Sequence, residues 1–256
     1  MTLPTDVAIR TTSHQGSRIK ILYELWSDWI HAIPSNGAIA GGMLESADDF
    51  MAALFNLVHG FYKQCIASLR SALETMVIAS ECTINAADER WTAWQGGDEI
   101  RFADSCKQFV AVPEIAAIEQ SMREQYFASL LPNVADPSLG QVWTRNLYGR
   151  LSQFSHARGD STNGGIWQSN GPIYSEEGMR LAYHSYIETF ALSAILAALA
   201  SKALVFRSGV GRIFLADNIG QFVAHPFAEL CVAYSAKTIR VLDDKPKGHC
   251  PSRERA

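Results

Sequence analysis

Near the end of a predicted helix over residues 138–156, an arginine and a histidine stand close together in the sequence. Arg150 and His156 are separated by five residues within the segment WTRNLYGRLSQFSH, which begins at Trp143. These residue types matter because a guanidinium forms paired hydrogen bonds with anionic oxygens and an imidazole exchanges protons near neutral pH. The pair is the strongest chemical lead in this sequence.

The spacing of this pair resembles the R-x4-6-H signature of the HEPN superfamily (higher eukaryotes and prokaryotes nucleotide-binding). Those compact helical bundles include metal-independent ribonucleases of toxin–antitoxin and anti-phage systems. The resemblance implies that Arg150 stabilises transition-state charge and that His156 is a general acid–base for attack by a ribose 2′-hydroxyl. It also implies a homodimer with RNA as substrate and a basic rim built from Arg145, Arg150 and Arg158. Leu151 departs from the family pattern, because active members favour a polar residue such as Asn after the arginine.

A purely structural interpretation of the same two residues stands beside the catalytic one. On a helical wheel Arg150 falls on the apolar face, whereas His156 lies about 120° away, so a straight helix would separate them. Under this interpretation Arg150 is buried and paired with a carboxylate such as Glu74 or Glu188, because a buried guanidinium needs a partner. His156 would then stabilise the carboxyl end of its helix.

A second candidate site begins with Arg70 and Glu74, which stand one turn apart on the polar stripe of a long predicted helix. The ordinary interpretation is an ion pair within the helix. The functional alternative is a polar cleft that also includes His156 and is closed by the loop over residues 167–174. Its candidate binding residues are Arg70, Glu74, Ser152, Trp167 and Asn170.

Four segments of the chain resemble a group of uncharacterised bacterial helical proteins. They cover residues 61–74, 94–96, 151–156 and 167–174. The resemblance implies a bacterial source and a helical fold, and it carries no activity with it.

Other common catalytic, nucleotide-binding and metal-binding motifs are absent from the sequence. It contains no H-E-x-x-H, no G-x-x-x-x-G-K-[ST], no G-x-G-x-x-G and no G-x-S-x-G. His184 and Glu188 are spaced to share a helix face, but a second ligand pair is missing. The five cysteines are odd in number and widely spaced, which argues against a disulfide framework or a zinc knuckle. We therefore expect no metal site and no cofactor.

Composition places the chain among ordinary globular proteins. Of its 256 residues 48% are hydrophobic and 19% are charged, and the net charge of -4 excludes an overall basic field. The N-terminus lacks the pattern of a signal peptide, and the longest apolar stretch, 13 uncharged residues after Glu188, is too short to cross a bilayer. These features predict a soluble cytoplasmic protein with no membrane partner.

Hydrophobic periodicity predicts an all-α fold, a single-domain bundle of about seven to eight helices with a long central helix pair. We expect a flexible N-terminal arm over 1–17, one helical domain over 18–242 and a flexible tail over 243–256. The longest predicted helix covers 46–82, after an irregular stretch at Gly41 and Gly42, and residues 190–200 are apolar all round. No strand is predicted.

Such a bundle suits several functions. The expected function is a structural or partner-binding role, and whether the protein is an enzyme stays open. The alternative is a HEPN-like metal-independent ribonuclease of a toxin or anti-phage defence system. A third hypothesis is a small-molecule binding protein whose pocket is closed by the loop around Trp167.

Overall fold

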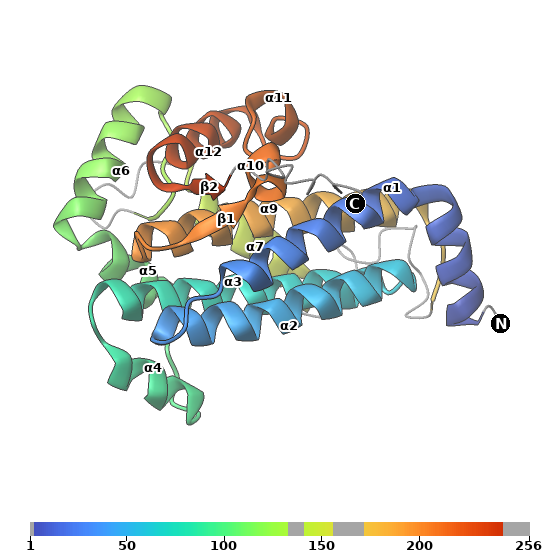
Figure 1. Cartoon of the computed structure of the whole chain (residues 1–256), viewed down its shortest axis with the longest axis horizontal. Coiled ribbons are helices and arrows are strands. Elements are labelled where there is room, and N and C mark those ends of the chain that lie inside the picture. The colour runs from blue at the N-terminus through green and yellow to red at the C-terminus, as the bar shows by residue number, and fades with distance from the viewer. Residues whose placement is uncertain (1–2, 133–140, 156–171, 243–256) are drawn as a thin grey trace, which may run out of the picture.

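The computed structural model describes residues 3–132, 141–155 and 172–242, and most of these residues are helical (Figure 1). This confirms the predicted all-α class. The single bundle of seven to eight helices and the domain limits stay predictions, and the expected tail over 243–256 lies outside the described residues. The helices are α1 (Pro4–Ala32), α2 (Ala38–Val58), α3 (Tyr62–Ile84), α4 (Asp88–Gln95), α5 (Phe102–Val110), α6 (Pro113–Tyr126), α7 (Trp143–Ser155), α9 (Glu176–Ala200), α10 (Ser208–Ile213), α11 (Ala216–Ile219) and α12 (His225–Thr238).

Two short strands also occur, β1 (Val205–Arg207) and β2 (Arg240–Leu242), and they pair in parallel. Each strand has three residues, which is too short for an alternating pattern to be detected in the sequence. The prediction that the chain contains no strand is therefore wrong, because this pair of strands is present.

The N-terminal arm expected over residues 1–17 is wrong from residue 4 onward. Pro4 occupies the first turn of α1, where its missing N–H costs nothing. The helix continues to Ala32 with a kink at Gln15, whose φ of -127° is not helical. The arm lacks an obvious periodicity because only Val7, Thr11 and Gln15 of this part are buried.

The long helix predicted over 46–82 is in fact two helices, α2 and α3. They are separated at Gly60, which has a φ of +77°. A Cβ at this position would lie 2.2 Å from the carbonyl oxygen of Ile173. The backbone around Ile173, which is distant in sequence, therefore packs against the chain at the point where the helix is interrupted. This packing cannot be read from local periodicity.

The irregular stretch expected at Gly41 and Gly42 is also wrong, because both glycines lie inside α2. A Cβ at Gly42 would approach the Cβ of Ala79 to 2.2 Å. The glycine therefore serves close packing of α2 against α3 rather than a turn.

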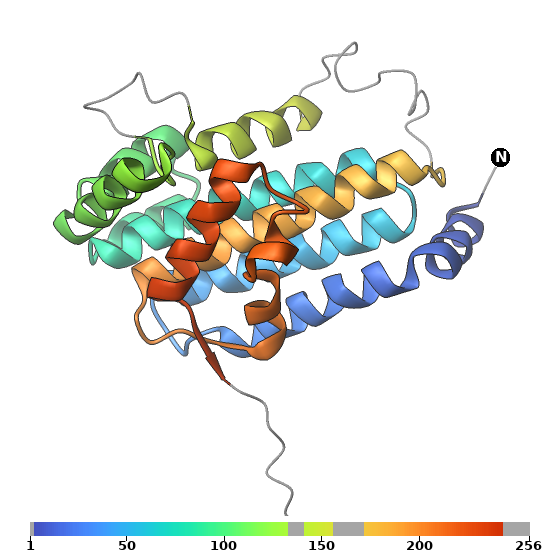
Figure 2. The same ribbon diagram turned by 90° about the horizontal axis from the view of Figure 1, so that it is seen from above.

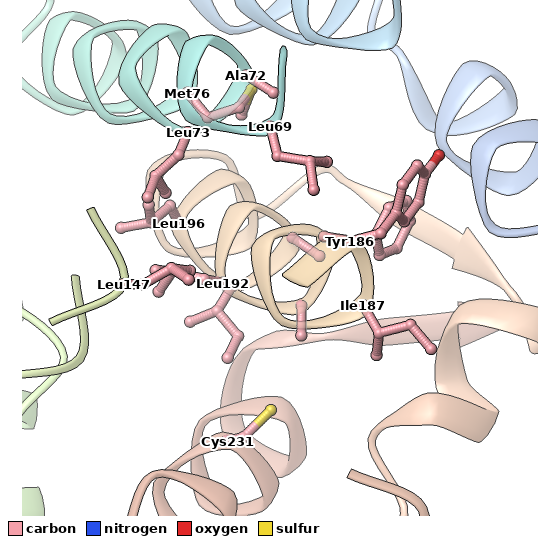
Figure 3. Packing of buried hydrophobic residues seen from close by; sticks show 14 of the residues in the cluster. Leu69, Ala72, Leu73, Met76, Leu147, Tyr186, Ile187, Leu192, Leu196 and Cys231 are labelled. Carbon is pink, nitrogen blue, oxygen red and sulfur yellow. The ribbon is translucent and has the colours of Figure 1, made fainter. Parts of the chain in front are cut away.

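Helix α9 is the centre of the fold. Figure 3 shows it surrounded by α3, α7 and α12, with Leu73, Leu147 and Cys231 among the buried side chains that face it. The prediction that residues 190–200 are buried all round is confirmed for 190–199, and only Ala200 is partly exposed. Helix α7 lies along one edge of the molecule, next to α3 and α9 (Figure 2).

Within the described residues, none of the helices combines the length and the apolar character needed to cross a bilayer.

Candidate functional site

Helix α7 carries polar side chains toward two different neighbours. Leu147 and Leu151, each 1% exposed, anchor the helix in the core. Tyr148 and Ser152 are one turn apart and face α3, where both contact Arg70. Arg150 contacts Glu188 of α9. Because successive residues are about 100° apart on a helix, two separate polar clusters form on opposite sides of the buried leucines.

The inner cluster consists of Arg70, Glu74, Tyr148 and Ser152. The Arg70 guanidinium pairs with Glu74 at 3.1 Å, and its Nε donates to Ser152 Oγ at 3.2 Å. A second guanidinium nitrogen donates to the Tyr148 hydroxyl. The structure thus brings Arg70, Glu74 and Ser152 together across α3 and α7, and it adds a tyrosine that the sequence analysis did not name.

Tyr148 links the two charged members of this cluster. Its hydroxyl donates to Glu74 Oε1 at 3.4 Å, and its ring stacks on Phe102 with centroids 3.9 Å apart. Burial and the charge of Glu74 raise the pKa of Tyr148, so the phenol stays neutral and able to donate at neutral pH. Arg70 contacts Glu74 on its own helix and both Tyr148 and Ser152 on α7. The inner cluster therefore joins α3 to α7.

The outer cluster consists of Trp143, Arg150 and Glu188. The indole N–H of Trp143 donates to Glu188 Oε1 at 2.9 Å, and the Arg150 guanidinium pairs with the same oxygen. The carboxylate side chain is only 4% exposed, whereas the Arg150 side chain is 57% exposed. Glu188 was one of the two partners expected for Arg150, but the expectation of a buried arginine is wrong.

The exposure of Arg150 has a simple cause in the length of its side chain. Its backbone lies at the border between the apolar face of α7 and the outer face. A long aliphatic stem can reach a buried carboxylate while the charged head keeps contact with water. Arginine at such a border therefore stays exposed although its wheel position is apolar.

A groove runs beside the outer cluster, between α7 and the start of α12. Its volume is about 510 Å³, and Ala224 and Phe227 form its far wall. The α7 residues that line it are Arg145, Asn146, Gly149, Arg150 and Gln153, all of them exposed. Among the described residues of this lining Glu188 is the one carboxylate, and it is buried beneath Arg150.

The remaining candidate residues divide into two groups. His156, Trp167 and Asn170 lie outside the described residues, so the predicted pairing of Arg150 with His156 stays a prediction. Arg150 and the inner cluster do not share a site, because they contact different helices from different sides of α7.

His184 and Glu188, whose spacing suits a shared helix face, contact different side chains in the described structure. The His184 ring meets Phe222 edge-on at 5.2 Å, and burial followed by Arg180 and Arg18 lowers its pKa. Glu188 instead contacts Trp143 and Arg150. In the part of the chain that the structure describes, no three His, Cys, Asp or Glu side chains are grouped as metal ligands would be.

Two members of these clusters were missed at the level of sequence. Tyr148 precedes Ser152 by four residues, and this spacing was the available signal for a shared face. The indole N–H of a buried tryptophan such as Trp143 needs an acceptor, and only the tertiary structure shows that this acceptor is Glu188.

Comparison of the chain with protein-family models, with curated proteins and with solved structures gives no match.

Proposed function

We propose that this chain is a partner-binding protein whose partner is single-stranded RNA, held in the groove along α7. The observation that carries the proposal is the exposed face of this helix, where Arg145 and Arg150 stand with the amides of Asn146 and Gln153. None of these exposed residues is acidic. Guanidinium groups bind phosphates, and amide side chains pair with the edges of bases.

The burial of Glu188 matters for this proposal. The carboxylate holds Arg150 at the groove, yet its own 4% exposure keeps most of its surface away from an incoming phosphate. Phe227 is buried and lies parallel to Trp143 with centroids 6.1 Å apart, so it gives the far wall an apolar floor that supports Trp143. Exposed amide and guanidinium side chains suit unpaired nucleotides better than duplexes, whose base edges are already paired.

Because the whole chain carries a net charge of -4, attraction to RNA must be local to this face. We expect modest affinity that falls steeply with added salt, since counterion release supplies most of it.

The test is fluorescence polarisation with a labelled oligouridylate as the probe. We expect Arg145→Glu to weaken binding at least about fivefold and to lower the salt slope by about one. The control is Arg10→Glu, because Arg10 is exposed on α1, lies over the Tyr174 ring and is not among the residues that line the groove. Equal affinity of wild type and Arg145→Glu, or an equal loss in both variants, would contradict the proposal. If the protein bound polyglutamate but not the oligouridylate, this result would also contradict the proposal.

The second candidate function is the HEPN-like metal-independent ribonuclease. It is favoured by one specific observation, namely that Arg145 and Arg150, two of the three arginines of its expected basic rim, line a common groove. Under this candidate the wild type cleaves RNA without added metal, and His156→Ala lowers the rate by about 10²–10⁴ while binding is retained. A wild type that binds the oligouridylate without cleaving it would reject the ribonuclease and leave the binding function standing.

A further inference from the structure

A cavity lies where α1, α9 and α10 meet the segment that contains α11. Figure 2 shows α10 and α11 beside α1 and α9 in this region. The cavity has a volume of about 300 Å³, near the lower limit for small-molecule sites. Among the described residues, none lines both this cavity and the groove along α7.

The inner wall of the cavity is apolar. Leu25, Ile187 and Ile213 form part of it, and all three are buried. Tyr183 of α9 and Phe222 add two aromatic rings, which meet edge to face with centroids 5.5 Å apart and an interplanar angle of 72°. Rings at nearly a right angle offer a third, flat ring one face and one edge to pack against. The wall therefore suits a planar apolar group.

The mouth of the cavity carries more positive than negative charge. Glu24 is the one carboxylate among the described residues of the lining, and two cations share it. Arg212, which also lines the mouth, lies 3.6 Å from it, and Lys20 of α1 lies 3.8 Å from it. One carboxylate cannot neutralise two cations, so part of their charge is left to act on a ligand.

The next carboxylate along α1 is Asp28, and it serves a different contact. Its side chain is buried and accepts the backbone N–H of Val210 at 3.0 Å, and it does not line this cavity. Asp28 instead lines a neighbouring hollow of about 220 Å³, to which Arg207 contributes a further cation. Asp28 and Arg207 together therefore leave the excess of positive charge at the mouth unchanged.

Two further arginines lie near the aromatic wall. The guanidinium of Arg18 lies over the Tyr183 ring, 5.5 Å from its centroid. Burial, followed by the charges of Arg180 and Arg18, lowers the pKa of His184, whose ring meets Phe222 edge-on. The positive charge thus extends from the mouth to the outside of both rings.

We propose that this cavity binds a small aromatic monocarboxylate, with its ring against Tyr183 and Phe222 and its carboxylate at Arg212. A guanidinium forms paired, charge-assisted hydrogen bonds with a carboxylate, whereas the present separation of Arg212 from Glu24 exceeds hydrogen-bonding distance. Glu24 keeps Lys20 as its partner when the ligand takes its place at Arg212. This site is independent of the RNA groove, so either proposal can fail without the other.

The probe is 2-naphthoate, followed by methyl NMR of the isoleucine side chains, and 2-naphthamide is its uncharged analogue. Ile21, Ile187 and Ile213 line the cavity, whereas Ile78 belongs to a different buried cluster and serves as the internal control. We expect the three lining methyls to shift together with a Kd below about 1 mM while Ile78 does not move. The amide should bind about tenfold more weakly, because it lacks the charge-assisted bonds to the guanidinium. Absence of shifts at the lining methyls, or an amide that binds as tightly as the carboxylate, would overturn the proposal.

Two substitutions at the mouth have opposite expected effects on 2-naphthoate. Arg212→Gln should weaken its binding about tenfold and leave 2-naphthamide unaffected, because only the carboxylate uses the guanidinium charge. Glu24→Gln removes the competing carboxylate and should strengthen 2-naphthoate binding about threefold. The control is Lys107→Gln, because Lys107 is an exposed cation that pairs with Asp104 and does not line the cavity. Unchanged 2-naphthoate affinity in Arg212→Gln, or an equal loss for both ligands, would overturn the assignment of the carboxylate to Arg212.

Discussion

The two arginine clusters of α7 differ in where their carboxylates lie. In the inner cluster Arg70 and Glu74 are about equally exposed, at 26% and 27%. In the outer cluster Arg150 is 57% exposed, but Glu188 is only 4% exposed. Arg70 makes more contacts than Arg150, yet loss of Arg70 would leave a carboxylate that water can reach.

We infer from this difference that the burial of the carboxylate, rather than the number of hydrogen bonds, decides how much each arginine contributes to stability. An ion pair between partly exposed groups contributes little, because water solvates either partner alone. Removal of one partner from a buried carboxylate leaves an uncompensated charge, which costs far more.

The largest effect is therefore expected for Arg150→Leu. The variant removes the Arg150 cation from Glu188 and leaves the Trp143 indole as its donor, and we expect a loss of about 2 to 3 kcal/mol in the free energy of unfolding. Arg145→Leu is the control on the same helix, and it should stay within about 0.5 kcal/mol of wild type. Urea unfolding provides the measurement.

The double variant Arg150→Leu with Glu188→Gln separates charge from packing. Glutamine keeps an oxygen for the Trp143 indole but carries no charge, so most of the lost stability should return. A double variant no more stable than Arg150→Leu would show that the buried charge is not the cause.

The carboxyl group of Asp49 extends the comparison, because none of the groups that shift its pKa is a cation. The pKa of Asp49 is raised to about 6, mainly by burial; a hydrogen bond from Ser71 opposes this shift, and the neighbouring Glu45 and Asp48 add to it. The folded protein therefore binds this proton more tightly than the unfolded chain. Between the ordinary value of 3.8 and about 6, stability falls as the pH rises, and the full penalty persists above 6.

Asp49→Asn removes this penalty while keeping an acceptor for Ser71. At neutral pH we expect the variant to be about 1 to 2 kcal/mol more stable than wild type, after a discount for partial exposure. The stability difference should vanish at acid pH, where Asp49 is protonated in both states. Unfolding curves on both sides of pH 6 check this, and a difference that does not change with pH would contradict it.

The smallest effect is expected for Arg70→Leu, despite its three hydrogen-bonding partners. Glu74, Tyr148 and Ser152 are all partly exposed and can bond to water instead, so we expect a loss of about 0.5 to 1 kcal/mol. A loss of unfolding free energy as large as that of Arg150→Leu would contradict this comparison and show that the inner cluster contributes more to stability.

Part of the candidate site followed from spacing alone. Arg70 and Glu74 were placed on one face because four residues make about one helical turn, and Ser152 was expected near them. Tyr148 was missed because a tyrosine at a half-buried position is as often a packing residue as a polar one. The partner of Arg150 could be narrowed to two carboxylates, but the choice required knowing which helix packs beside α7.

Local patterns in the sequence determined the helical class, the polar face of α3 and the buried character of α9, because helical periodicity depends only on neighbours in the chain. The tertiary structure decided the break at Gly60, the helical state of Gly42 and the partner of Arg150. Each of these depends on a segment distant in sequence, namely Ile173, Ala79 and Glu188. Packing against a remote element changes the preferred conformation of a residue without leaving any mark on its own neighbours in the sequence.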